Sequence, residues 1–213
     1  MNGPLQWEAP RAAPAPEAMP LEFAATEESH FITGFWLFIA SDVVLFACLF
    51  ATFLVYRGAN LNMGPMGVSL PVNLTAVMEE TVLLLTSSFT CSLAVHEMRR
   101  GHRRALSLLL GATLLLGLGF VGLELHDFGH LLATGYAWSR SSFLSSFFVL
   151  VATHGGHVSF GILWGIALLI QLGIHGLGAK SARKVYTFAL YWHFLDIIWV
   201  FIFTVVFLTS TLR

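Results

Sequence analysis

The chain has 213 residues and a formal net charge of −1. Only 11% of its residues are charged, compared with about 25% in typical soluble domains. Hydrophobic residues make up 56% of the chain and the mean hydropathy is +0.76, which predicts a membrane protein and gives no indication of nucleic-acid binding. The two cysteines, Cys48 and Cys91, lie in apolar runs without metal-ligand spacing, which favours buried thiols.

Residues 1–30 differ in composition from the rest, because they are rich in alanine and proline. They contain no basic segment followed by an apolar one, so the sequence predicts no cleaved signal peptide. We interpret this segment as a flexible cytoplasmic tail, with a short ordered segment that docks on a partner as the alternative. Residues 31–213 are then predicted to form one transmembrane domain.

Five apolar segments follow, and each has the roughly 20 residues that a helix needs to cross a bilayer. They cover approximately residues 32–56, 72–95, 106–126, 143–174 and 185–209. We therefore predict an all-α membrane protein with five transmembrane helices in a bundle. No internal repeat is evident, which weakens the interpretation as an inverted-repeat transporter.

The basic residues of the loops predict the orientation. The loop after the second segment contains Arg99, Arg100, Arg103 and Arg104, and the loop after the fourth contains Lys180, Arg183 and Lys184. The other two loops contain only Arg57 and Arg140. The positive-inside rule then places the N-terminus in the cytoplasm and the C-terminus outside.

Two glycine patterns lie within apolar segments. GLGFVG (117–122) matches a dinucleotide-binding pattern, but that pattern requires a preceding strand and a following helix start. GILWG (161–165) is a GxxxG pattern. Since small residues let membrane helices approach closely, both patterns predict packing faces instead.

Ionisable residues inside the predicted spans carry the functional information, because charge in the bilayer interior is costly and usually faces a bundle interior or a polar cavity. The set comprises Asp42, Glu79, Glu80, Glu124, Asp127, His154, His157, His193 and Asp196. His154 and His157 share one helical face, as do His193 and Asp196. Three interpretations stay open: a haem or metal site, a proton relay, and hydrogen-bonded groups that lock helices together or hold lipid headgroups.

Five sequence blocks carry a resemblance to a known family. They are GFWLFIASDVVLFACLFATF (34–53), ETVLLLTSS (80–88), GFVGLELHDFGHLL (119–132), SSFLSSFFVLVATHGGHVSFGILW (141–164) and LYWHFLDIIWVFIFTVV (190–206). In this order they resemble subunit III of the bacterial haem–copper terminal oxidases, in its five-helix form. The chain is most similar to the bo-type and aa-type quinol oxidases; Asp42 stands where many cytochrome c oxidase relatives have glutamate.

The resemblance implies a non-redox accessory subunit of a proton-pumping quinol:O2 oxidoreductase in the bacterial cytoplasmic (inner) membrane. It would contact catalytic subunit I directly, which carries the haems and copper, and would assemble with subunits II and IV. It would carry no catalytic residue, metal or redox cofactor of its own, and would hold phospholipids in a cleft. Alternatives are subunit III of a cytochrome c oxidase and, from another class, a stand-alone membrane haem protein or transporter.

The family's polar positions map onto numbered residues of this sequence. Residues expected in the lipid cleft or near the proton pathway are Asp42, Glu80, Glu124, His154 and His157. His193 and Asp196 are expected to form a polar pair that fixes the last helix in the bundle. These roles are hypotheses from the resemblance.

Overall fold

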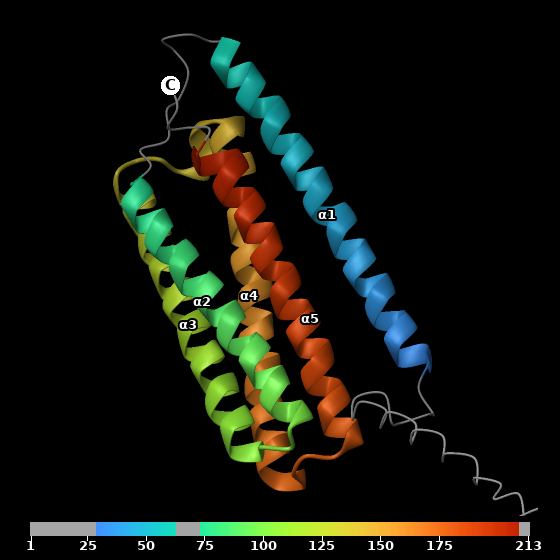
Figure 1. Cartoon of the computed structure of the whole chain (residues 1–213). Helices are drawn as coiled ribbons and strands as arrows, with labels where there is room; N and C mark the ends of the chain where they lie inside the picture. The colour runs from blue at the N-terminus through green and yellow to red at the C-terminus, as the bar shows by residue number, and fades with distance from the viewer. Residues whose placement is uncertain (1–28, 63–72, 209–213) are drawn as a thin grey trace, which may run out of the picture.

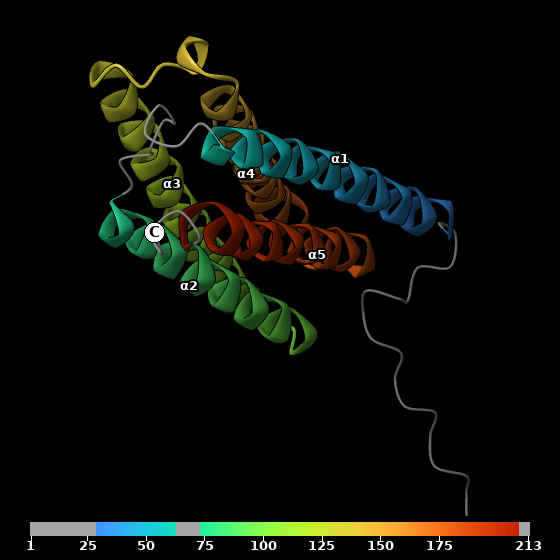
Figure 2. The same cartoon turned by 90° about the horizontal axis from the view of Figure 1, so that it is seen from above.

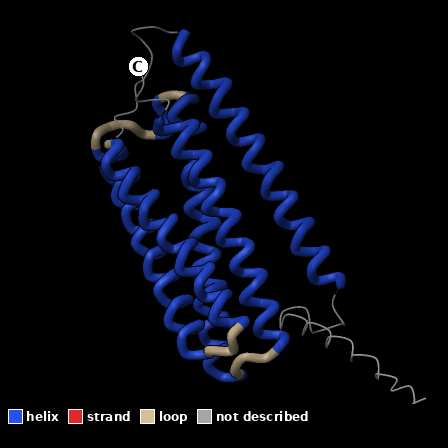
Figure 3. Tube along the Cα trace, viewed as in Figure 1, coloured by secondary structure: helices blue, strands red, loops and turns tan. Residues whose placement is uncertain are grey.

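The computed structural model describes residues 29–62 and 73–208 (Figure 1). The elements are α1 (Ser29–Asn62), α2 (Leu74–Arg99), α3 (Arg103–Ala133), the 3-10 helix η3 (Trp138–Arg140), α4 (Ser142–His175), α5 (Ala179–Ile202) and the π-helix η4 (Phe203–Leu208). The described residues contain no strand (Figure 3), so the all-α prediction is confirmed for them. The predicted tail at residues 1–30 lies almost wholly outside this range and stays a prediction.

Short turns connect the helices at one end of the bundle (Figure 1). Gly101, between α2 and α3, has a φ of +75°, and Gly176, after α4, has a φ of +76°. Glycine adopts these left-handed conformations without a steric penalty, so each helix ends sharply and the next one runs back. Consecutive helices are therefore antiparallel.

Beside Gly101, the imidazole of His102 donates to the Glu97 carboxylate at 2.6 Å, and this hydrogen bond lowers the pKa of Glu97.

Hydroxyl side chains within the helices satisfy their donors locally. Thr81 donates to the carbonyl of Val77, and Thr187 to that of Arg183, four residues earlier in each case. In a medium without water, every polar group needs an internal partner. A serine or threonine can therefore sit in an apolar helix at little cost.

Helices α4 and α5 occupy the middle of the bundle. In both views α5 lies between α1 on one side and α2 on the other (Figures 1 and 2). The largest buried side chains include Tyr191, Trp192 and Trp199, all from α5. The core is therefore built around α5.

Glycines let α3 and α4 approach the aromatic side chains of α5. A Cβ on Gly117 would overlap the Trp192 ring, and one on Gly161 would crowd it. A Cβ on Gly165 would overlap Leu114 and crowd Phe188. The predicted packing faces are thus confirmed at Gly117, Gly161 and Gly165. Gly122 faces open space, so the first pattern contributes to packing only in part.

Among the residues that the structure describes, four helices are long and apolar enough to cross a membrane, which makes the chain a multi-pass membrane protein. These spans are Thr33–Asn60, Arg103–Ala133, Ser142–His175 and Ala179–Leu208. Helix α2 has 26 residues, which is long enough to cross a membrane. It is not among the four candidate spans because its composition is less apolar. The fifth predicted span stays a prediction.

Candidate functional site

Helix α2 faces α5 through a row of hydroxyl groups, and two tryptophans of α5 donate to it. The Trp199 indole Nε1 donates to Thr81 Oγ1 at 3.1 Å, and the Trp192 indole donates to Ser87 Oγ at 3.0 Å. All four side chains are buried. The two indole donors are satisfied inside the bundle, which fixes the rotation of α2 against α5.

His193 and Asp196 belong to the same contact between α2 and α5. His193 Nδ1 lies 2.7 Å from Ser88 Oγ, and its Nε2 lies 3.2 Å from Ser92 Oγ. The Asp196 carboxylate lies close enough to both Ser88 and His193 to interact with them. Each serine hydroxyl can donate or accept, so a neutral imidazole satisfies both contacts with its proton on either ring nitrogen.

Asp42 of α1 meets His157 of α4. His157 Nδ1 lies 2.7 Å from the Thr153 carbonyl oxygen, which can only accept, so this nitrogen carries a hydrogen. His157 Nε2 faces Asp42 Oδ1 at 3.7 Å, and Asp42 Oδ2 is buried without a hydrogen-bond partner. The contact between His157 Nε2 and the Asp42 carboxylate is favourable when the two groups share one proton. The Tyr191 hydroxyl donates to the His157 carbonyl at 3.0 Å and connects this pair to α5.

His154 lies one turn before His157 and is enclosed by aromatic rings. Its imidazole is fully buried, stacks on Trp199 at 5.3 Å between ring centroids, and meets Phe120 edge-on at 5.9 Å. Within the described part of the chain, neither ring nitrogen has a hydrogen-bond partner. His154 therefore fills an aromatic site and takes no part in either polar contact.

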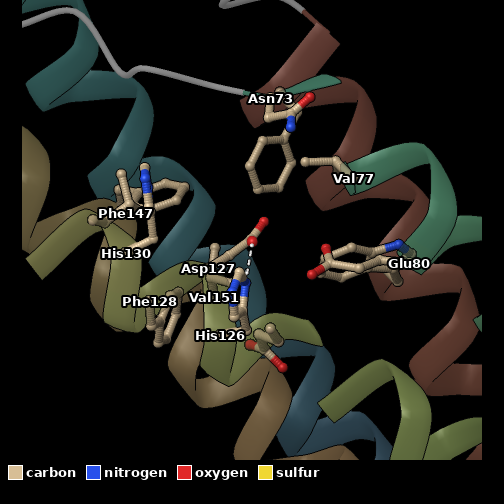
Figure 4. A pocket seen from close by; sticks show the side chains of 13 residues that line it. Asn73, Val77, Glu80, His126, Asp127, Phe128, His130, Phe147 and Val151 are labelled. Carbon is tan, nitrogen blue, oxygen red and sulfur yellow. Dashed lines mark hydrogen bonds and ion pairs between the residues drawn. The ribbon is translucent and has the colours of Figure 1, made fainter. Parts of the chain in front are cut away.

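Glu80 of α2 and Glu124 of α3 are both buried and line one pocket of about 270 Å³. Figure 4 shows the carboxylates of Glu80 and Asp127 pointing toward the same space from two helices. Glu124 packs on the backbone of α4, because a Cβ at Gly155 would overlap its carboxylate. By contrast, the neighbouring Glu79 is exposed.

The histidines offer little to a metal. Both nitrogens of His193 are engaged by serines, and Nδ1 of His157 is hydrogen-bonded to a backbone carbonyl. Among the residues that the structure describes, no group of three or more histidine, cysteine, aspartate or glutamate side chains is arranged to hold a metal ion.

Comparison with known proteins gives the same family over most of the chain. The family model described as cytochrome c oxidase subunit III matches residues 22–211. The chain belongs to the cytochrome c oxidase subunit III family. Within this family, the quinol oxidase subunit 3 of Bacillus subtilis is 47% identical over 189 residues, which cover 89% of this chain and 92% of the relative.

Two further members of the subunit III family have similar identity and different names. The cytochrome c oxidase subunit 3 of Bacillus sp. (strain PS3) is 44% identical over 191 residues, covering 90% of this chain and 91% of the relative. The cytochrome bo(3) ubiquinol oxidase subunit 3 of Pseudomonas aeruginosa is 45% identical over 183 residues, covering 85% of this chain and 86% of the relative. Family membership is therefore clear, whereas identity alone does not separate the electron donors.

The subunit III motif residues fall into separate neighbourhoods. The structure brings Asp42 to His157, Glu80 to Glu124, and His193 to Asp196 through Ser88, while His154 stays apart in its aromatic site. Sequence reasoning missed the hydroxyl row of α2. The acceptors Thr81 and Ser87 are six residues apart, and their donors Trp199 and Trp192 are seven apart. Spacings of about two helical turns on both helices are the signal that predicts a shared helix–helix face.

Proposed function

We propose that this chain is the non-redox accessory subunit III of a proton-pumping quinol:O2 oxidoreductase in the bacterial cytoplasmic membrane. The observation that carries the proposal is the family match over residues 22–211, together with relatives at 45–47% identity that are named quinol or ubiquinol oxidase subunit 3. In this role the chain belongs to an oxidase complex but is not itself the site of oxygen reduction.

The proposed topology has five membrane spans, with the N-terminus in the cytoplasm and the C-terminus outside. Two features support it. The basic turns after α2 and α4 lie at the same end of the bundle (Figure 1), as the positive-inside rule requires. Arg103, the first residue of α3, donates to the carbonyls of Leu172 and Gly173 near the end of α4, which joins the two turns. Helix α2 can be the fifth span because its buried hydroxyls face α5 and not the lipid.

The proposed partners are catalytic subunit I, in direct contact, and subunits II and IV in the same complex. Subunit I would hold the haems and copper, and this chain would hold phospholipid. The outward face of α1 supports an apolar partner or lipid, since Leu37, Val44 and Val55 are each more than 60% exposed. An apolar surface of this kind belongs against a membrane or another membrane subunit.

The proposed contribution of Asp42 and His157 is a proton-holding pair beside the catalytic subunit. The geometry that supports this is the placement of His157 Nε2 3.7 Å from the Asp42 carboxylate. A pair that shares one proton can accept or release it when its surroundings change. His193 and Asp196 would instead stabilise the packing of α5 on α2.

The test is a mild purification of the complex through a tag on this chain. The haem spectrum, the subunit composition and oxygen uptake with quinol or reduced cytochrome c are then measured. Co-purification of haem–copper subunits with quinol-driven uptake, and a colourless chain after dissociation, is the expected result. A pigmented chain that purifies alone would overturn the proposal in favour of a stand-alone haem protein.

A second candidate is subunit III of a cytochrome c oxidase. The observation in its favour is the 44% identity to relatives of that name from Bacillus sp. (strain PS3) and Bacillus subtilis. The same purification decides between the two, since oxygen uptake would then require cytochrome c and would not respond to quinol.

A further inference from the structure

The outer edge of the contact between α2 and α5 carries polar side chains at the middle of the bundle. This edge, which we call the α2–α5 seam, comprises Ser88, Ser92, His193 and Asp196 and lies where the two helices run side by side (Figures 1 and 2). His193 lies at the middle of the 30-residue span Ala179–Leu208, and Asp196 lies one turn further along. Both are partly exposed, and Ser92 is exposed. Polar surface therefore points outward at a depth where hydrocarbon surrounds a membrane protein.

The donors of this chain do not satisfy Asp196. A carboxylate has about four acceptor sites on its two oxygens, and the side chains that act on Asp196 are Ser88 and His193. Both ring nitrogens of His193 are engaged by Ser88 and Ser92, at 2.7 and 3.2 Å. Ser88 has a single hydrogen to donate, so most acceptor sites of Asp196 lack a donor among the described residues. Asp196 Oδ1 is enclosed without a partner, so a donor from outside would meet Oδ2.

Apolar side chains flank the α2–α5 seam on both helices. On each helix the outward positions recur after four and then three residues: Leu85, Phe89 and Ser92 on α2, and His193, Ile197 and Val200 on α5. The four apolar members are 41–64% exposed. Spacings of three and four residues are those with which helices pack along one another. The surface therefore fits a further helix that lies along the seam.

The chemistry of the seam identifies its partner. Lipid tails have no donor and would leave Asp196 unsatisfied. A second copy of this chain would bring the same surface, whose carboxylates would face each other and whose imidazole is already engaged. An amide, ammonium or guanidinium group supplies the missing N–H donors. We infer that the α2–α5 seam binds a transmembrane helix of another subunit, and that this helix presents a side-chain N–H donor to Asp196.

The inference rests on the proposed place of this chain in an oxidase complex, so one sample tests both. The full chain carries the photo-cross-linking residue p-benzoylphenylalanine in place of Ile197 and is irradiated in membranes. The complex is then purified, and mass spectrometry identifies what is joined to this chain. We expect an adduct with another subunit of the complex, in a membrane-spanning segment that contains an N–H-bearing side chain.

Asp196→Asn in the same chain tests the role of the carboxylate. This substitution keeps the shape of the side chain and removes the charge that the partner's donor meets. When the membranes are solubilised in detergent before irradiation, the adduct yield is expected to fall roughly tenfold, as for a lost charge-assisted hydrogen bond. Thr81→Val is the matched control, because it removes the hydrogen bond from Trp199 between the same two helices, inside the bundle and away from the seam. It is expected to give the wild-type yield.

Adducts with lipid alone, or with a second copy of this chain, would overturn the inference even if haem–copper subunits co-purify. An adduct that Asp196→Asn does not weaken, or that Thr81→Val weakens equally, would also overturn it. If the Ile197 variant does not assemble, Leu85 on the α2 side of the seam takes the cross-linker, and the same outcomes apply. Absence of haem–copper subunits from the purified wild type would instead contradict the proposed function, and the inference with it.

Discussion

Helices α1 and α5 differ in how much of each is buried inside the bundle. Helix α1 is the most apolar of the four candidate spans, yet only 17% of its apolar stretch is buried, compared with 44% in the less apolar α5. The buried side chains of its described part are Asp42, Phe46 and Phe53, which form one stripe. In a membrane protein, high hydropathy marks a surface for lipid or a partner, because association between helices gains little from burying apolar groups there.

The two helices are also attached to the bundle differently. Helix α5 joins α2 through indole, imidazole and hydroxyl hydrogen bonds, and it fits against glycines of α3 and α4. Helix α1 meets α4 through the Asp42–His157 pair and through ring contacts of Phe46 and Phe53. We therefore expect α5 to determine the stability of the chain and α1 to be the helix that is more easily displaced.

The largest difference in stability is expected between alanine substitutions of one tryptophan in α5 and one in α1. Trp192→Ala in α5 should lower the free energy of unfolding by about 3–5 kcal/mol, because it leaves a cavity against Gly117 and Gly161. Trp36→Ala in α1 should change it by only about 0.5 kcal/mol, since Trp36 is 56% exposed. Unfolding of the full chain in detergent measures both, and equal losses would refute the distinction between the helices.

Adjacent glycines of α4 should respond in opposite directions. Gly155→Ala should cost about 1–3 kcal/mol, because the new methyl group overlaps the buried Glu124 carboxylate. Gly156→Ala should stabilise the helix by up to about 1 kcal/mol, since a Cβ there meets open space. The thermal midpoints of the two variants provide the measurement. A stabilising Gly155→Ala would mean that the Glu124 carboxylate moves away from α4 at little cost.

The hydrogen bonds between α2 and α5 should have a smaller, measurable coupling. His193→Ala and Ser88→Ala are each expected to destabilise the chain, and a double-mutant cycle should give a coupling of about 0.6–1.7 kcal/mol. The physical reason is the 2.7 Å contact between Ser88 Oγ and His193 Nδ1. Additive effects would show that the two groups do not interact, and Ser41→Ala, whose hydroxyl bonds only within α1, is the control.

The smallest effect on global stability is expected for Asp42→Asn, about 0.5 kcal/mol or less. The substitution keeps the size of the side chain and breaks no direct hydrogen bond, because His157 Nε2 lies 3.7 Å from Asp42 Oδ1. Hydrogen exchange should increase in α1 and stay unchanged in α5. In the assembled oxidase, unchanged proton pumping by this variant would remove the proton-holding half of the proposal for Asp42 and leave only a structural role.

Much of the architecture follows from the sequence. The apolar segments predict helices because a backbone in lipid must satisfy its hydrogen bonds internally, and the motif blocks indicate subunit III of the terminal oxidases. The ionisable residues inside these segments mark the polar interior, since a carboxylate such as Glu80 cannot face lipid at low cost. The GxxxG pattern likewise predicts the close approach of α4 to its neighbours.

Only the tertiary structure decides which polar groups meet. Glu79 and Glu80 are adjacent in sequence, but helix rotation exposes one and buries the other. Asp42 and His193 both lie inside predicted membrane spans, yet Asp42 meets α4 while His193 meets α2. Depth along a helix is fixed by a local rise of about 1.5 Å per residue, whereas the direction of a side chain depends on how neighbouring helices pack.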